Sequence, residues 1–81
     1  MIKVYTIPNC EYCDKVKDYL RSKNIEFEEI NLKAKENREA RAFYRSLGID
    51  VAPVVTGEID GIEWYVAGDD IEGIEKSMRI L

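Results

Sequence analysis

Two cysteines with two residues between them, Cys10 and Cys13, place the narrowest constraint on what this chain can fold into. They stand where a run of β-branched and aromatic residues, 2–7, gives way to apolar residues at helical spacing. The sequence contains no other cysteine and no histidine. A solitary Cys-x-x-Cys pair between a strand and a helix indicates an α/β unit with a redox-active dithiol at the beginning of a helix.

The composition indicates the compartment in which such a pair would work. The sequence has 81 residues, of which 46% are apolar and 35% charged, and we expect one domain over residues 1–81. The longest apolar runs, such as 51–55, are too short to span a bilayer, and residues 1–5 lead into a strand without a signal-peptide core. We therefore expect a cytoplasmic protein. In a reducing cytosol, a cysteine pair is more often catalytic than structural.

Charge and loop size narrow the function further. The net charge of −4 argues against nucleic acid or an anionic membrane as the main partner, because both require a basic surface. A disulfide between cysteines three positions apart closes a very small loop, and the entropic stabilisation from such a link is minor. A purely structural disulfide is therefore the weaker interpretation.

Four segments have the composition of β-strands, rich in β-branched and aromatic residues and bounded by turn residues. They are residues 2–7, 26–31, 51–56 and 62–66. Pro8 and Asn9 end the first segment. The turn residues 58–61 join the last two segments, which predicts a hairpin.

Three further segments repeat apolar residues at the spacing of one helix face. Their apolar positions are Cys13, Val16 and Leu20; Ala40, Phe43, Tyr44 and Leu47; and Ile71, Ile74, Met78 and Leu81. Gly48 follows the second segment as a left-handed cap would, and Asp69 with Glu72 resembles a capping box before the third. The order strand, helix, strand, helix, strand, strand, helix predicts an α/β fold with a four-stranded mixed sheet covered by helices.

The helical spacing gives the two sulfurs different surroundings. Cys13 belongs to an apolar stripe and should face the core, whereas Cys10 lies at or just before the first turn and should stay accessible. Unpaired N–H groups and the positive end of the helix dipole then lie beside Cys10, and such a site lowers the pKa of a thiol. The carboxylate of Glu11 opposes this effect. We predict that Cys10 attacks a disulfide and that Cys13 resolves the mixed disulfide.

Three motifs in order along the chain resemble those of the glutaredoxin family, and the likeness covers nearly the whole chain. Cys10-Glu11-Tyr12-Cys13 resembles the family's Cys-Pro-Tyr-Cys, with glutamate in place of proline. Val51-Ala52-Pro53 resembles its Thr-Val-Pro, in which the proline follows a cis peptide bond. Val66-Ala67-Gly68-Asp69-Asp70 resembles its Gly-Gly turn and aspartate before the last helix. The resemblance implies a thioredoxin-like fold, a four-stranded mixed sheet flanked by three helices.

The resemblance also implies a function: a dithiol thiol–disulfide oxidoreductase of electron transport and cell redox homeostasis that uses glutathione as its reducing co-substrate. The glutathione groove would lie beside Cys10, with Tyr12 along it and the backbone of Ala52, just before Pro53, pairing with the glutathione cysteine. The γ-glutamyl end of glutathione would be held by Gly68, Asp69 and Asp70. A helix N-terminus suits a carboxylate on physical grounds as well.

Two departures from the family pattern weaken the expected affinity for glutathione. Many glutaredoxins carry a lysine three residues before the first cysteine, where it meets the glycine carboxylate of glutathione, and here that position is Ile7. Arg38 or Arg41 on the second helix could supply the missing cation. Ala67 replaces the second glycine and narrows the approach to the groove.

The sequence leaves other functions open. The chain also resembles glutaredoxin-like proteins that donate electrons to ribonucleotide reductase and are recharged by thioredoxin reductase. An iron–sulfur cluster would have to be shared between two copies with glutathione as a co-ligand, because two thiols cannot complete a four-ligand site. A non-catalytic adaptor has no need of both cysteines. We expect no metal site, a monomer, and disulfide-containing proteins as substrates.

Several candidate residues also have simpler interpretations. Asp69 could serve only as a helix cap, and Tyr12 could be a half-buried packing residue. The stripe of Arg38, Arg41 and Arg45 is usually just the solvated face of a helix. Trp64-Tyr65 is most simply core and edge packing.

Overall fold

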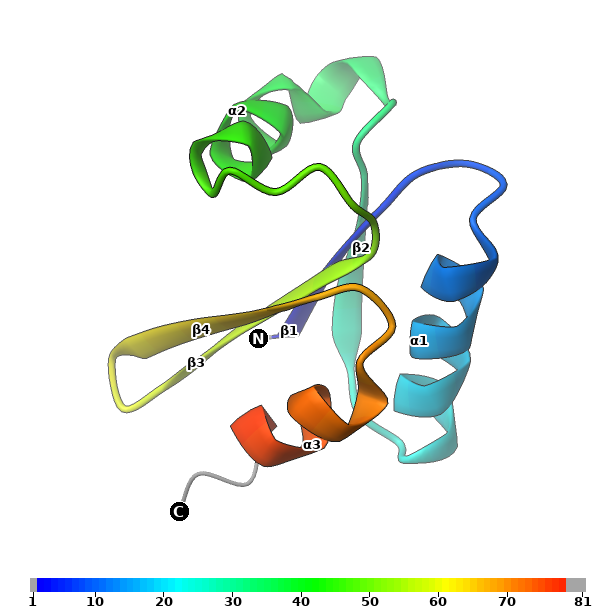
Figure 1. Ribbon diagram of the computed structural model, residues 1–81, viewed down its shortest axis with the longest axis vertical. Helices are drawn as coiled ribbons and strands as arrows, with labels where there is room; N and C mark the ends of the chain where they lie inside the picture. Colours follow the sequence, from blue (N-terminus) through cyan, green and yellow to red (C-terminus); the bar gives the residue numbers. More distant parts are fainter. Residues whose placement is uncertain (1, 79–81) are drawn as a thin grey trace.

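A four-stranded mixed sheet lies at the centre of the structure, a computed structural model that describes residues 2–78 (Figure 1). The strands are β1 (Ile2–Thr6), β2 (Phe27–Asn31), β3 (Val54–Ile59) and β4 (Ile62–Ala67). The helices are α1 (Glu11–Ser22), α2 (Arg38–Ser46) and α3 (Ile71–Met78), with a short 3₁₀-helix, η1 (Lys35–Asn37), before α2. The predicted order of strands and helices is confirmed.

The strands run in the order β2-β1-β3-β4 across the sheet. β1 is parallel to β2 and antiparallel to β3, and β3 is antiparallel to β4, so the predicted mixed sheet is confirmed. Asp60 and Gly61 form the two-residue turn between β3 and β4, both with positive φ (53° and 81°), as this type of hairpin requires. Because β1 and β2 are parallel neighbours, the chain leaves both strands at the same edge of the sheet.

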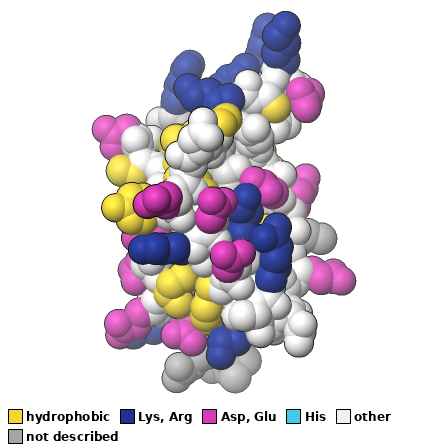
Figure 2. Space-filling view, turned by 90° about the vertical axis from the view of Figure 1, so that its right-hand side faces the viewer, with side chains coloured by type: hydrophobic (Ala, Val, Ile, Leu, Met, Phe, Trp, Pro, Cys, Tyr) yellow, Lys and Arg dark blue, Asp and Glu magenta, His cyan; other side chains and the backbone are white. Residues whose placement is uncertain are grey.

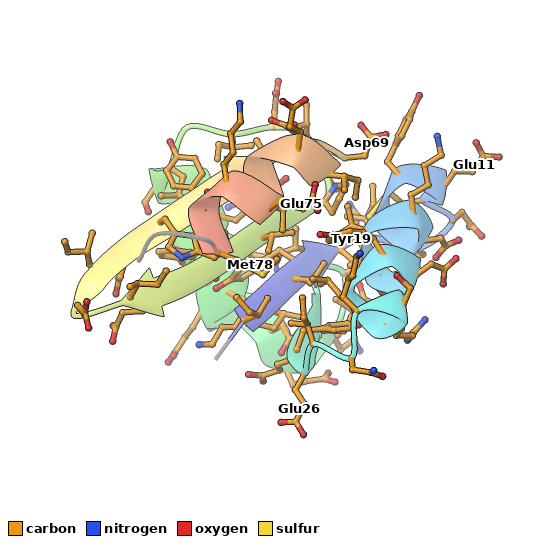
Figure 3. All side chains as sticks on the ribbon, turned by 90° about the horizontal axis from the view of Figure 1, so that it is seen from below. Glu11, Tyr19, Glu26, Asp69, Glu75 and Met78 are labelled. Carbon is orange, nitrogen blue, oxygen red and sulfur yellow. A yellow bond between two sulfur atoms is a disulfide. The ribbon has the colours of Figure 1, made fainter. Side chains whose placement is uncertain are left out.

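The helices form two layers (Figure 1). Helices α1 and α3 cover one face of the sheet around a core of Val4, Val16, Leu20, Val55 and Ile74. Between these two helices, Tyr19 and Glu75 lie close to one another (Figure 3). Burial raises the pKa of Tyr19, and the carboxylate of Glu75 adds to the effect. Helix α2 lies on the other face, where its Tyr44 packs in a cluster with Tyr5, Leu32 and Val54.

Strand ends differ from the sequence prediction by a few residues. The third strand begins at Val54 instead of Val51, because Pro53 has no N–H to donate to a ladder; Val51 is half exposed. This strand also continues to Ile59, which shortens the turn from the predicted 58–61 to two residues. The first strand ends at Thr6 and leaves residue 7 exposed.

The ends of the helices follow local rules, with one correction. Gly48 has φ +70° and its N–H donates to the carbonyl of Arg45, which confirms the predicted left-handed cap after α2. The capping box placed at Asp69 is wrong by one residue, because Oδ1 of Asp70 accepts the N–H of Gly73 at 2.9 Å. Leu81, predicted on the face of α3, lies outside the described residues. Within residues 2–78, no helix is both long and apolar enough to cross a membrane.

Candidate active site

Cys10 and Cys13 form a disulfide at the beginning of α1, with their Cα atoms 5.2 Å apart. Cys13 is 2% exposed and packs into the core with the apolar face of the helix, whereas Cys10 is half-buried. The predicted difference between a buried and an accessible sulfur is confirmed. Only Cys10 can meet a partner at the surface without rearrangement of the core.

The sulfur of Cys10 caps the first turn of α1. Cys10 has an extended backbone (φ −115°, ψ 106°), and its Sγ accepts the N–H of Cys13 at 3.1 Å. Asn9, with φ 57°, supplies the turn that brings the chain from β1 to this position. The same N–H group and the helix dipole would stabilise a thiolate on Cys10 after reduction.

The loop before β3 forms a wall on the other side of the Cys10 sulfur. The carbonyl oxygen of Ala52 lies 4.0 Å from Sγ of Cys10, and the Ala52–Pro53 peptide bond is cis, as the resemblance implied. Gly68, with φ +82°, donates its N–H to the carbonyl of Pro53 at 2.7 Å. These contacts bring together four of the predicted site residues from three separate segments of the chain.

Tyr12 lies at the surface next to the disulfide. Its side chain is 55% exposed, which excludes the half-buried packing role. The Nζ atom of Lys15 lies 5.4 Å from the centre of its ring, a cation–π contact within one helical turn. The ring is therefore available to a partner of Cys10.

The two aspartates before α3 have different roles in the chain. Asp70 holds the first turn of the helix through the N–H of Gly73, as described above. Asp69 is half-buried, and its carbonyl accepts the N–H of Ile71 at 2.9 Å. In Figure 3, Asp69 lies at the same end of the molecule as Glu11 at the start of α1. On the α1/α3 side of the disulfide, the carboxylates of Glu11, Asp69 and Asp70 thus outnumber the cation Lys15.

Of the two arginines that could bind the glycine carboxylate of glutathione, one is already engaged in other contacts. Nη1 of Arg41 donates to the carbonyls of Leu32 and Ala34, at 2.9 and 2.8 Å, and so holds the chain between β2 and η1. Arg38 is exposed at the beginning of α2. Ile7 is exposed and apolar where many glutaredoxins have lysine. Arg38 is thus the remaining candidate of the two.

A polar network beside the site was not anticipated from the sequence. The buried hydroxyl of Thr6 donates to Oε2 of Glu29 at 3.0 Å, and Nζ of Lys17 lies 3.1 Å from the same oxygen. Burial raises the pKa of Glu29, but hydrogen bonds from Lys17 and Thr6 and the charges of Lys17 and Arg21 outweigh it, so the pKa lies below its ordinary value. The network ties α1 to β1 and β2. The position of Lys17, one turn after Cys13, was the only signal for it.

In the part of the chain that the structure describes, no group of three or more His, Cys, Asp or Glu side chains is arranged to hold a metal ion.

Comparison with known proteins gives one matching family. The family model for Glutaredoxin matches residues 2–61. A glutaredoxin-like 8.6 kDa protein of the rubredoxin operon of Clostridium pasteurianum is 43% identical over 53 residues, which cover 63% of this chain and 71% of that protein. Glutaredoxin 1 of Rickettsia typhi is 35% identical over 81 residues, which cover 98% of this chain and 74% of that protein.

Among solved structures, NrdH-redoxin from Escherichia coli superposes with a TM-score of 0.74 at 28% identity, covering 93% of this chain and 91% of that one. It is described as a glutaredoxin-like protein with a thioredoxin-like activity profile. Together with the sheet and helix order, this similarity establishes the thioredoxin-like fold that the sequence predicted.

Proposed function

The chain belongs to the glutaredoxin family of thiol–disulfide oxidoreductases, and from that premise we propose that it reduces protein disulfides through Cys10 and Cys13. The observation that carries this proposal is the helix cap made by Cys10, whose sulfur accepts the N–H of Cys13 at 3.1 Å. An amide that faces the sulfur favours its charged form over the neutral thiol. Because Cys13 is buried, it cannot reach a substrate at the surface, and we assign it the second step, the attack on the mixed disulfide at Cys10.

The exchange proceeds through one mixed disulfide. In the reduced protein the Cys10 thiolate attacks one sulfur of the substrate disulfide, and the other substrate sulfur leaves as a thiolate and takes up a proton. Cys13 then loses its proton and attacks Sγ of Cys10. The second substrate sulfur leaves as a thiol, and the Cys10–Cys13 disulfide of the present structure remains. Two electrons have passed from the dithiol to the substrate.

After each cycle the Cys10–Cys13 disulfide must be reduced again. We infer that a flavoprotein of the thioredoxin reductase type does this in preference to glutathione. Of the charged groups assigned to glutathione by resemblance, Arg41 is engaged with two backbone carbonyls and Asp70 with the cap of α3. Ile7 adds no charge. The thioredoxin-like activity profile of the similar NrdH-redoxin also supports this source. Ribonucleotide reductase in the cytoplasm, the substrate that the resemblance to such electron donors implies, is then a candidate.

Glutathione is the second candidate, and a specific observation favours it. The backbone of Ala52 lies beside the Cys10 sulfur, and Gly68 is bound to Pro53, which is the arrangement that the resemblance assigns to a glutathione groove. In this alternative the site consists of Tyr12, Ala52, Pro53, Gly68, Asp69 and Asp70. Arg38 would have to supply the cation that Arg41 does not.

Recycling assays separate the two electron sources. The oxidised protein is supplied with NADPH and either thioredoxin reductase or glutathione plus glutathione reductase, with insulin as the disulfide substrate. We expect sustained NADPH oxidation with thioredoxin reductase and little with glutathione. Faster turnover with glutathione, together with a glutathione adduct on Cys10 seen by mass spectrometry, would make glutathione the electron donor. Failure of chemically reduced protein to reduce either insulin or a small uncharged disulfide would overturn the reductase proposal itself.

A further inference from the structure

The charges of this chain are separated along the sequence. Residues 33–46 carry five basic and two acidic side chains, a net charge of +3, although the whole chain has −4. The remainder therefore carries −7. Four of the five cations are exposed, and they are named here the basic surface: Lys33, Lys35, Arg38 and Arg45.

The cations of the basic surface are not neutralised by neighbouring side chains. The ion pairs formed within residues 2–78 all use Lys17, Arg21 or Lys76, and none of them involves a residue between 33 and 46. Figure 2 shows Lys and Arg side chains gathered at the upper end of the molecule, where Figure 1 has η1 and α2. The positive potential of this end is therefore exposed to solvent and to any partner.

The basic surface begins, with Lys33, at the edge of the sheet from which the Cys10 loop also leaves. β1 leads to Cys10, its parallel neighbour β2 leads to the basic surface, and the N–H of Leu32 donates to the carbonyl of Thr6 at 2.8 Å. Arg41 fixes the next residues through the carbonyls of Leu32 and Ala34. Two segments that leave adjacent parallel strands at one edge of a sheet form the rim of a common site.

The other rim of the disulfide has the opposite charge. Glu11 begins α1 and lies at the same end of the molecule as Asp69 (Figure 3), and Asp70 follows Asp69 directly before α3; the nearby cation is Lys15, over the ring of Tyr12. A partner whose disulfide reaches Cys10 thus meets cations on one side and carboxylates on the other. Such an arrangement favours one orientation of a charged partner over its reverse.

We propose that the protein substrate presents its disulfide on an acidic segment, which lies along the basic surface while the sulfur reaches Cys10. This inference rests on the proposed reductase function and specifies its substrate. The surplus of −7 elsewhere repels an acidic partner from other approaches, so the basic surface both attracts and orients it. A nucleic acid, which is charged along its whole length, would meet the acidic rim as well.

Matched disulfide peptides test the proposal. Three peptides share one intramolecular disulfide, and their flanking positions are Glu, Gln or Lys. At low salt we expect kcat/KM for the Glu peptide to exceed that for the Gln peptide by about three- to tenfold, with the Lys peptide slowest. The preference should fade at high salt, because the Debye length shrinks to about 3 Å at 1 M.

Two variants with the same change in charge localise the effect. Arg38→Glu should move the ratio of the Glu to the Gln peptide toward one, although three cations of the basic surface remain. Lys23→Glu changes an exposed residue at the far end of α1 and should leave the ratio unchanged. An acidic residue is favourable at the first position of α2, so Arg38→Glu should fold. Arg38→Lys should keep the preference.

The two proposals fail in different ways. Hydroxyethyl disulfide, which is small and uncharged, reports whether the wild-type protein exchanges disulfides at all; if neither it nor any peptide is reduced, the reductase proposal fails. If these substrates are reduced but the Glu peptide has no advantage, or if Lys23→Glu removes the advantage as completely as Arg38→Glu, the acidic-segment inference is overturned.

Discussion

The two faces of the sheet are packed to different degrees. On the α1/α3 face the five core side chains are fully buried. On the α2 face, Val54 is also fully buried, but Tyr5, Leu32 and Tyr44 retain 6–8% exposure. Phe43 of α2 retains 39%, although the sequence placed it on the apolar stripe of this helix. Beside it lies a hollow of about 680 Å³, bordered by Phe43, Leu47 and Tyr65, that α2 does not cover.

The difference in packing matches the different roles of helices α1 and α2. Helix α1 must hold the N–H of Cys13 against the Cys10 sulfur, and a close-packed interior allows little displacement of a helix. Helix α2 supplies no reacting atom. It carries the exposed cations of the basic surface, which act over a longer range and tolerate small shifts. The tightly packed layer thus contains the helix that positions the reacting cysteines, and the looser layer contains the helix that carries the basic surface.

The largest effect should come from the reacting sulfur on the tightly packed side. Cys10→Ser should lower disulfide reduction by ~10³-fold or more, because a hydroxyl is a far weaker nucleophile than a thiolate. In the Cys13→Ser protein, Cys10 should still attack the substrate disulfide, but the mixed disulfide on Cys10 should accumulate and be visible by mass spectrometry. An adduct on Cys13 in the Cys10→Ser protein, with exchange preserved, would reverse the assigned roles.

The next effect compares one chemical change in both layers. Leu20 of α1 is fully buried, whereas Leu47, the last residue of the α2 stripe, is only partly buried. Leu20→Ala should lower the free energy of unfolding by about 2–5 kcal/mol, as expected for a buried leucine that leaves a cavity. Leu47→Ala should cost about 1 kcal/mol, since its side chain is already partly exposed to water and leaves a smaller cavity. Urea denaturation measures both, and equal losses would contradict the comparison.

Two glycines extend the comparison from cavities to crowding. A Cβ at Gly57, on the α1/α3 face of β3, would lie 2.6 Å from Cε2 of Trp64 and 3.0 Å from Cδ1 of Ile2, so Gly57→Ala should cost about 1–3 kcal/mol. At Gly48, after α2, nothing lies within 4 Å and only the positive φ resists a side chain. Gly48→Ala should therefore cost about 1 kcal/mol. A larger loss at Gly48 than at Gly57 would show that backbone conformation outweighs crowding here.

Much of this arrangement could be predicted because it depends on local rules. The helical spacing placed Cys13 inside and Cys10 at the surface, and Gly48 marked the end of α2 because a left-handed cap favours glycine. Only the resemblance to glutaredoxins, not periodicity, indicated the cis bond before Pro53. The glutathione contacts assigned by the same resemblance remain predictions.

The sequence prediction failed in two situations. Either two neighbouring residues were equally suited to cap a helix, or a contact joined segments that are distant in the sequence. Asp69 and Asp70 are both good caps, and α3 begins after the second. Glu29 lies in a strand whose polar and apolar residues do not alternate cleanly, so its side could not be assigned. The register with β1 pairs Glu29 with Val4 and thereby places it on the α1 face. Such a pairing depends on the assembled sheet.

The smallest effect concerns the network that joins the tightly packed layer to the edge strand. The folded-state pKa of Glu29 lies below its ordinary value of 4.5, so between these two values the unfolded chain binds more protons than the folded one. Stability from this carboxylate is therefore fully present above the ordinary value and is lost as the pH falls through the lower, folded-state value. Because Glu29 is 40% exposed, the contribution should be only about 0.5 kcal/mol.

Glu29→Gln should remove this acid-dependent part of the stability. From neutral pH to about pH 3, the urea midpoint of the wild type should fall more steeply than that of the variant, and the two curves should converge at the acid end. Glu26→Gln is the matched control, because Glu26 points away from the protein in Figure 3 and forms no ion pair within residues 2–78. If Glu26→Gln flattened the curve as much as Glu29→Gln, general charge repulsion would explain the acid sensitivity. The link from α1 through Lys17 to Glu29 would then contribute nothing to the tighter layer.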